Sequence, residues 1–396
     1  MSIEISKIVQ AMQPSATLAM SAKAKELKAK GETVYDLSLG EPDFRTPEHI
    51  CKAAFAAIEA GHTRYTVASG IPELKKAVTN EYKNRFGIEY APAQCVVSNG
   101  AKHALHNSFF CTLNPGDEVI IPAPYWVSYA EVVKLSGAIP VIVSTDESNN
   151  FKLTPEAFRA AITPKTRMLL LCSPSNPTGS IYSKEELTAL ADIVLEKNLF
   201  VLADEIYDHL VYGSNKFYSF PTLRDGLVDR TILINGVSKT YAMTGWRIGW
   251  ALAPENVAKK MASLQSQETS NPCSISQYAA LAAITGDQTC VADMVAEFAK
   301  RRDYVASRIA AMPGVTCPDM GGAFYCFFNI KEHLGRDYAG TRIDTDEQWC
   351  LELLAKHKVA TVMGSAFGAP GYVRASFATS MDHLEKAFDR IAAFIG

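Results

Sequence analysis

The sequence predicts an α/β fold with a large, mostly parallel sheet of seven strands and a smaller α+β domain. Seven apolar runs of strand length follow one another, amphipathic helical stretches separate most of them, and this alternation ends near residue 285. Strands that alternate with helices form a mostly parallel sheet covered on both faces. The runs are Cys95–Ser98, Glu118–Ile121, Ala138–Val143, Met168–Cys172, Phe200–Ala203, Thr231–Ile234 and Arg247–Leu252.

Several predicted helices begin at recognisable capping residues. Ser183 followed by Glu186 has the pattern of a capping box, in which each residue bonds the backbone of the other. Thr154-Pro155 and Thr46-Pro47 each place proline at a predicted first helical position. These signals predict helices that begin near residues 184, 155 and 47.

The C-terminal part of the chain has a different pattern. A long helix is predicted over 289–312, short strands over 323–330 and 359–362, and a last helix after Ser380. A chain of 396 residues exceeds one ordinary core, so about two domains are expected. The predicted organisation is an N-terminal arm at 1–30, a large domain at 47–287, and a small domain formed by 31–46 with 288–396.

Composition and charge exclude several classes of protein. The net charge of −3 provides no basic surface for nucleic acid, and no apolar run is long enough to cross a bilayer. The N-terminus lacks the apolar stretch of a secretory signal. Nine scattered cysteines without a CxxC pair argue against a disulfide framework or a zinc site. We therefore expect a cytoplasmic protein with no metal site and no nucleic-acid or membrane partner.

Two predicted strands are followed by turns that, considered one at a time, do not by themselves indicate a functional site. Gly100 and Ala101 expose backbone N–H groups where a helix is expected to begin, which suits a phosphate. One glycine also fits a plain strand-to-helix turn. Asn176 lies in an Asn-Pro-Thr-Gly turn after 168–172, and most such turns have no further role.

Two other strand ends carry charged side chains. Asp204 closes an apolar strand, where an ionised carboxylate needs a cation or several donors, although it could equally cap a following helix. Lys239 follows the strand over 231–234, and a lone lysine in a loop is usually solvated. Arg247 lies on the next apolar segment, where a guanidinium requires an anion.

Together these strand ends match one cofactor. The carboxyl ends of parallel strands share one edge of the sheet, where ligands bind. Pyridoxal phosphate is held at four points. They are a phosphate-binding site, an acidic partner for the pyridine nitrogen, a donor to the ring oxygen, and an amine that reacts with the aldehyde. The carboxylate of Asp204 would keep the ring nitrogen protonated, and Lys239 would form a Schiff base with the aldehyde.

Six motifs resemble those of fold-type I, class I/II aminotransferases, and in particular the bacterial aspartate aminotransferase branch. The motifs are SLGEPDF (38–44), YTVASGIPEL (65–74), PYWVSY (124–129), NPTG (176–179), DEIY (204–207) and SKTYAMTGWRIGW (238–250). They follow the family's order and spacing over nearly the whole chain. The resemblance implies the pyridoxal-phosphate-dependent transferase fold. It also implies ping-pong transfer of an amino group between an L-amino acid, expected to be aspartate, and 2-oxoglutarate.

The resemblance also implies roles for residues that match the family's motifs. Lys239 would be the catalytic lysine, Asp204 would pair with the pyridine nitrogen, Asn176 and Tyr207 would donate to the ring oxygen, and Trp126 would stack on the ring. Gly100, Ala101, Lys102, Ser238 and Arg247 would hold the phosphate.

Further positions concern the substrate and a partner subunit. Arg374 would bind the substrate α-carboxylate as a bidentate fork, with Gly40, Trp126 and Asn176 beside it. Tyr65 would reach the phosphate of the neighbouring subunit, which implies a homodimer with shared sites. Ser15 and Thr17 could line the distal end of the substrate pocket.

Four other functions share some of these features. A pyridoxal phosphate lyase or decarboxylase, or an aminotransferase for aromatic or other amino acids, could use the same fold and the same lysine. A non-enzymatic regulator of this fold usually carries an added DNA-binding domain, and no extension is present to hold one. A dehydrogenase predicts a GxGxxG turn after its first strand, which the sequence lacks.

Overall fold

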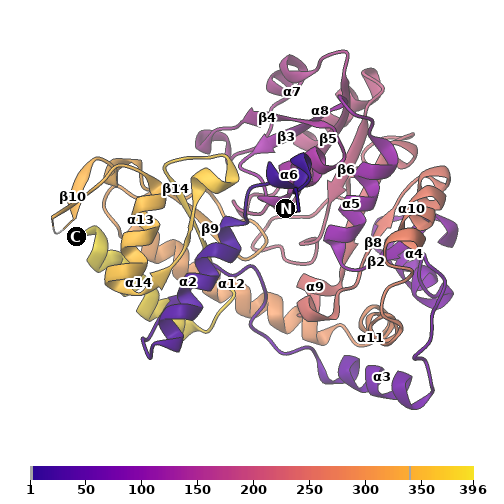
Figure 1. The fold of residues 1–396 in the computed structure, drawn as a ribbon, viewed down its shortest axis with the longest axis horizontal. Helices are drawn as coiled ribbons and strands as arrows, with labels where there is room; N and C mark the ends of the chain where they lie inside the picture. The colour runs from indigo at the N-terminus through magenta and orange to yellow at the C-terminus, as the bar shows by residue number, and fades with distance from the viewer. Residues whose placement is uncertain (1–2, 339) are drawn as a thin grey trace.

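Seven strands form the central sheet in the order β2-β8-β7-β6-β5-β3-β4 (Figure 1). The structure is a computed structural model that describes residues 3–338 and 340–396. Neighbouring strands are parallel except at β8, which runs antiparallel to both β2 and β7. The strands are β2 (Cys95–Ser98), β3 (Glu118–Ala123), β4 (Ile139–Ser144), β5 (Thr166–Cys172), β6 (Phe200–Asp204), β7 (Thr231–Gly236) and β8 (Gly249–Leu252). The predicted seven-stranded, mostly parallel sheet is confirmed.

One strand boundary differs from the prediction in a way that matters for the site. The last run was predicted to begin at Arg247, but β8 begins at Gly249. Arg247 itself has a left-handed backbone with a φ of 57°, which no strand residue adopts. Its side chain is therefore set by a turn and not by the alternation of a strand.

Helices cover both faces of the sheet, as parallel topology requires. On one face, Leu170 and Leu202 pack against helices α5 (Ala101–Thr112), α6 (Ser128–Leu135) and α10 (Glu255–Glu268). On the other face, Leu169 and Val201 pack against α7 (Pro155–Ala161) and α8 (Lys184–Glu196). The β2-β8-β7 end of that face is covered by α3 (Glu48–Glu59), α4 (Pro72–Phe86) and α11 (Ser274–Thr285).

Two of the three predicted helix starts have the expected caps. The Ser183 side chain accepts from the backbone of Glu186, and the Glu186 carboxylate accepts from the backbone of Ser183, which completes the capping box. Thr154 caps α7, with Pro155 at its first position. The prediction at Pro47 is wrong by one residue, because Pro47 is itself the N-cap of α3 and the Thr46 hydroxyl instead donates to the carbonyl of Ala242.

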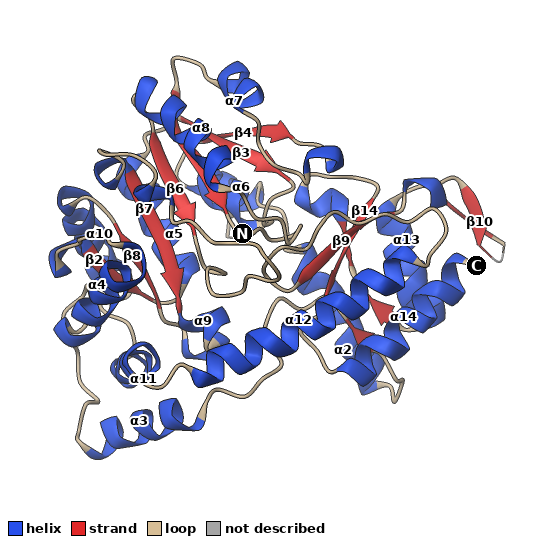
Figure 2. Ribbon diagram, turned by 180° about the vertical axis from the view of Figure 1, so that it is seen from behind, coloured by secondary structure: helices blue, strands red, loops and turns tan. Residues whose placement is uncertain are grey.

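The C-terminal region is built on smaller sheets, of which β13-β14-β9 and β10-β11 are antiparallel and β1-β12 is parallel (Figure 2). Its main sheet has the order β13-β14-β9, and a long helix, α12, runs beside it. The elements are α12 (Thr289–Ala310), β9 (Tyr325–Asn329), β10 (Arg336–Tyr338), β11 (Thr341–Ile343), α13 (Asp346–Glu352), β12 (Val359–Ala360), β13 (Val362–Met363), β14 (Tyr372–Ser376) and α14 (Met381–Ile395). The short strand pieces predicted around 359–362 are two separate strands, since β12 pairs with β1 (Tyr35–Asp36) and β13 pairs with β14.

The N-terminal segment contains two helices with different surroundings. Helix α2 (Ala16–Ala29) buries Met20 and Ala24 in the core of the C-terminal region, whereas α1 (Lys7–Gln10) buries no residue and lies against α6. The predicted domain limits of 1–30, 47–287, and 31–46 with 288–396 stay a prediction. No helix among the described residues has the length and apolar character that a membrane crossing requires.

Candidate active site

A cavity of about 450 Å³ lies at the carboxyl ends of the central strands, between the large sheet and the C-terminal sheet. Every residue that the sequence predicts for the site lines this cavity except Gly100 and Tyr65. The predicted residues that line it are Gly40, Ala101, Lys102, Trp126, Asn176, Asp204, Tyr207, Ser238, Lys239, Arg247 and Arg374. Strand ends that are far apart in the sequence are thus brought to one cavity, as the parallel topology predicts.

Lys239 lies on the short helix α9 (Val237–Thr240), which follows directly from β7. Its Nζ donates a hydrogen bond of 2.6 Å to the backbone carbonyl of Gly40. Burial lowers the pKa of this ammonium to about 8, while the nearby carboxylate of Glu41 acts in the opposite direction. A lysine with such a pKa has a sizeable neutral fraction near neutral pH, which a nucleophilic amine needs.

Asp204 is the last residue of β6 and is buried. The Tyr129 hydroxyl donates to its Oδ2 at 2.6 Å, and the backbone N–H of Ile206 donates to its Oδ1 at 3.2 Å. Burial raises the pKa of this carboxyl to about 6, although both hydrogen bonds lower it. A turn and not a helix follows Asp204, so the alternative in which it caps a helix is wrong.

Tyr207 and Asn176 present polar groups beside Asp204. The hydroxyl of Tyr207 lies 3.0 Å from that of Tyr325, which comes from β9 of the C-terminal sheet. Asn176 uses its Oδ1 to accept from an Nη1 of Arg374 at 3.1 Å. Because its oxygen is occupied, Asn176 offers its amide NH₂ group as a donor to a ligand.

Arg374 is a buried cation without an acidic partner among the described residues. Its Nη2 donates to the backbone carbonyl of Ser38 at 2.6 Å, and its Nε is buried without a hydrogen-bond partner. The guanidinium carbon lies 4.6 Å from the centre of the Tyr325 ring and 4.9 Å from that of Phe367. A buried guanidinium that has no acidic partner and a free N–H group favours the binding of an anion.

One end of the cavity has the character of a phosphate seat. Gly100 is the N-cap of α5, with a φ of 83°, and a Cβ there would lie 2.4 Å from an Nη2 of Arg247. The missing side chain therefore leaves room for this guanidinium beside the first backbone N–H groups of α5. Ser238 and Ala101 line the same cavity. A helix N-terminus with an arginine and a hydroxyl suits a phosphate.

Trp126 and Gly40 have neighbours that the sequence does not predict. The Nζ of Lys102 lies 4.7 Å from the centre of the Trp126 ring. A Cβ on Gly40 would lie 2.7 Å from the Tyr325 hydroxyl. Glycine at position 40 is therefore already required by the protein itself, and not only by an approaching substrate.

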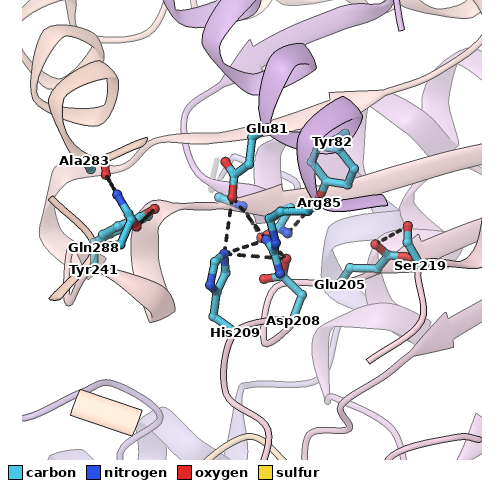
Figure 3. Close-up of polar contacts among 12 residues, drawn as sticks. Glu81, Tyr82, Arg85, Glu205, Asp208, His209, Ser219, Tyr241, Ala283 and Gln288 are labelled. Carbon is cyan, nitrogen blue, oxygen red and sulfur yellow. Dashed lines mark hydrogen bonds and ion pairs between the residues drawn. The ribbon is translucent and has the colours of Figure 1, made fainter. Parts of the chain in front are cut away.

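A polar cluster connects α4 with Asp208 and His209, which follow Tyr207 in the chain (Figure 3). The Nη1 of Arg85 on α4 lies 2.7 Å from Asp208 Oδ2 and 3.1 Å from Glu81 Oε1, and His209 points to the same carboxylates. The buried Glu205 accepts from Ser219, and burial raises the pKa of its carboxyl to about 8. The cluster thus joins α4 to the 205–209 segment.

Several residues of the site are not singled out in the sequence, although Tyr129 and Ser38 lie within quoted motifs. Tyr129 ends the motif PYWVSY, and its bond to Asp204 follows only from the packing of α6 on the sheet. Tyr325 lies in no motif. Tyr65, in turn, is 89% exposed and lies outside the cavity of its own chain.

The cavity of this α/β fold thus combines a buried lysine, a helix N-terminus beside Arg247, and the buried Arg374. The chain belongs to the aminotransferase class I and II family, which it matches over residues 32–391. It is therefore a pyridoxal-phosphate-dependent aminotransferase.

Known relatives agree with this assignment. The chain is 48% identical to the aspartate aminotransferase of Geobacillus stearothermophilus, with 99% of each chain covered. It is 46% identical to the aspartate/prephenate aminotransferase of Cereibacter sphaeroides, with 98% of each covered. The crystal structure of the aspartate aminotransferase from Rhizobium meliloti superposes with a TM-score of 0.96 at 43% identity, covering 100% of this chain and 99% of that one. The Thermus thermophilus aspartate aminotransferase with maleate has a TM-score of 0.93 at 40% identity, covering 99% of this chain and 100% of that one.

Proposed function

We propose that this aminotransferase exchanges amino groups between L-aspartate and 2-oxoglutarate in a ping-pong reaction, as a cytoplasmic homodimer. The observation that carries the proposal is the buried guanidinium of Arg374, which lines the same cavity as the amine of Lys239 and has no acidic partner among the described residues. Both substrates bring an α-carboxylate and a second carboxylate, and the cavity also contains cations to receive the second one.

The residues of the cavity fit pyridoxal phosphate. Backbone N–H groups of α5, Ser238 and Arg247 would hold the phosphate, and the space left by Gly100 accommodates the arginine. Asp204 would accept from the ring nitrogen, and Tyr207 with Asn176 would donate to the ring oxygen. When bound, the cofactor supplies an aldehyde that reacts with amines and a ring that withdraws electrons from the substrate Cα.

Lys239 has two tasks in this proposal. Its amine would hold the cofactor aldehyde, and the same Nζ would accept the proton from the substrate Cα and later give it back. The lowered pKa suits a group that must be neutral before each proton transfer. The carbonyl of Gly40 orients Nζ within the cavity.

Arg374 would hold the α-carboxylate. Its place between the rings of Tyr325 and Phe367 fixes the plane of the guanidinium, so a planar carboxylate is held in one orientation. That orientation sets which substituent of Cα is aligned for cleavage.

The distal carboxylate has its own candidate cation. Once Arg247 is assigned to the phosphate and Arg374 to the α-carboxylate, Lys102 and Lys25 are the remaining basic residues that line the cavity besides Lys239. We assign the distal carboxylate to the side chain of Lys102, in place of the phosphate contact that the resemblance implies, and Ser15 and Thr17 line the same cavity. The relative from Thermus thermophilus was solved with maleate, a four-carbon dicarboxylate, which supports a dicarboxylate as the substrate class.

A second copy of the chain would complete the site. Tyr65 is exposed and lies outside its own cavity, as expected of a residue that reaches a partner's phosphate. The N-terminal arm exposes Ile3, Ile5, Ile8 and Val9, an apolar surface that a partner would cover. All nine cysteines are free, which is typical of a reducing cytoplasm. Light scattering during gel filtration should give twice the 43.2 kDa of one chain.

A panel of amino donors tests the function directly. With 2-oxoglutarate as acceptor, aspartate should give the highest kcat/KM. Without an oxo acid, aspartate should give at most one equivalent of oxaloacetate per active site. Lys102→Met should raise KM for aspartate more than for alanine, whereas Lys25→Met should change neither. Release of ammonia or CO₂ without an oxo acid would instead identify a lyase or decarboxylase, and a preference for aromatic donors would contradict the choice of aspartate.

A further inference from the structure

Two histidines and a glutamate converge beside the phosphate seat, outside the cavity already described. His103 and His106 lie one turn apart on α5, and Glu268 lies at the end of α10, which packs on α5. His103 Nε2 is 3.1 Å from Glu268 Oε2, and His106 Nδ1 is 3.6 Å from Glu268 Oε1. The side chains of His103, His106 and Glu268 are 14%, 27% and 28% exposed, so a metal ion from solvent can reach all three.

This geometry is close to that of a zinc site. Tetrahedral Zn²⁺ with bonds of about 2.0–2.1 Å places its ligand atoms roughly 3.3 Å apart. One ligand atom from each of the three residues lies within 4.8 Å of the other two, and the two distances above reach different oxygens of the Glu268 carboxylate. Two imidazoles with one carboxylate, and an open position for water, form a common donor set for Zn²⁺ and similar divalent ions.

The group stands on a rigid support. Gln265, one turn before Glu268, is fully buried and accepts from Ser98 at 2.6 Å and from Asn107 at 3.1 Å. Its own amide donates to the carbonyl of Val97 at 2.8 Å. These bonds lock the end of α10 onto β2 and α5, so the ligands are held in place before a metal arrives.

His103 also contacts the turn that forms the phosphate seat. The backbone N–H of Asn99, the residue before Gly100, donates to His103 Nδ1 at 3.3 Å. A neutral imidazole that accepts at Nδ1 carries its proton on Nε2, which here faces Glu268. A metal on Nε2 requires that proton to move to Nδ1, and a protonated Nδ1 cannot accept from Asn99.

We propose that His103, His106 and Glu268 bind one Zn²⁺-like divalent transition-metal ion per chain, and that binding loosens the adjacent phosphate seat. The metal would detach the backbone of Asn99 from His103 and so free the turn that presents the N–H groups of α5 to the cofactor phosphate. By linkage, the metal and the cofactor would weaken each other's binding by the same factor. The sequence predicts no metal site because its cysteines are scattered. The packing of α5 against α10, which brings the two histidines to Glu268, does not follow from the spacing of these residues in the sequence.

Titration of the untagged holoenzyme with ZnCl₂ in a calorimeter, in a buffer that does not chelate zinc, tests the site. One equivalent of Zn²⁺ should bind per chain. His106→Gln and Glu268→Gln should each weaken binding by more than about 100-fold, since even an outer partner of a metal ligand contributes 10–100-fold. His62→Gln, at an exposed histidine elsewhere, should leave it unchanged. Absence of stoichiometric binding, or equal affinity in all variants, would refute the site.

Cofactor release after dilution of the holoenzyme tests the coupling without relying on turnover. Saturating ZnCl₂ should speed the loss of cofactor absorbance in the parent and in His62→Gln. It should have no effect in His106→Gln, which also controls for zinc that binds free cofactor in solution. A release rate in the parent that does not change with zinc, despite stoichiometric binding, would refute the coupling.

Discussion

The ammonium of Lys239 lies 2.6 Å from the backbone carbonyl of Gly40, although 199 positions separate the two residues in the chain. The same 38–41 segment provides the carbonyl of Ser38, to which Arg374 donates. One short segment therefore fixes both the reactive amine and the arginine assigned to the substrate carboxylate. Their relative position is set by backbone atoms, which a change of side chain does not remove.

The lowered pKa of Lys239 predicts how the cofactor-free enzyme captures pyridoxal phosphate. Only the neutral amine attacks an aldehyde, and a depressed pKa makes that form available at lower pH. The rate of capture, followed by absorbance in stopped flow, should therefore rise with pH through about 8. A rise centred near the ordinary lysine value of about 10.4 would contradict the burial of this amine.

Arg374→Met should separate catalysis from stability. Loss of a buried charge pair with the substrate costs about 2–5 kcal/mol, so kcat/KM for aspartate should fall by roughly 30-fold or more. The melting temperature of the cofactor-free protein should change little, because the loss of the hydrogen bonds to Ser38 and Asn176 is offset by the removal of a buried cation that has no acidic partner among the described residues. Arg336→Met, at an exposed arginine, is the control and should alter neither property.

Tyr129→Phe should move the pH profile in a defined direction. The Tyr129 hydroxyl lowers the pKa of Asp204 against the effect of burial, so its removal raises that pKa. A carboxyl with a higher pKa loses its charge at a higher pH, and the acid limb of kcat/KM should move upward. Tyr125→Phe provides a neighbouring control. A shift to lower pH in Tyr129→Phe would show that the hydroxyl does not act through Asp204.

Arg85→Met should destabilise the turn that carries Tyr207. The side chain of Asp208 is only 1% exposed, and it would lose its 2.7 Å partner. An unpaired buried acceptor of this kind costs about 2–3 kcal/mol in the free energy of unfolding, measurable by urea denaturation. The double change Arg85→Met with Asp208→Asn should recover part of the loss. If the double variant is less stable than the single one, the pair is not the source of the stability.

The strand ends that form the site could be predicted from the sequence because the carboxyl ends of parallel strands lie at the same edge of the sheet. Asp204, Asn176 and Lys239 each follow a buried apolar run, and the alternation of strands with helices places those ends at one edge. No knowledge of side-chain packing is needed for that step.

The remaining contacts depend on packing between regions and could not be read from local patterns. Tyr325 reaches Tyr207 from a strand of another sheet, and Ser38 reaches Arg374 from a segment without regular structure. Arg247 was predicted to lie in a strand because its neighbours are apolar, whereas its left-handed backbone turns it toward Gly100. Such a conformation leaves no mark in hydrophobic periodicity.

Reduction of the holoenzyme with borohydride, followed by peptide mass spectrometry, identifies the lysine that binds the cofactor. We expect a phosphopyridoxyl group on Lys239 alone, and none in Lys239→Ala, which should retain cofactor without turnover. Lys102→Met, at another lysine of the same cavity, should still be labelled at position 239. A label on any other lysine of the parent enzyme, or turnover by Lys239→Ala comparable to that of the parent, would show that Lys239 is not the catalytic lysine.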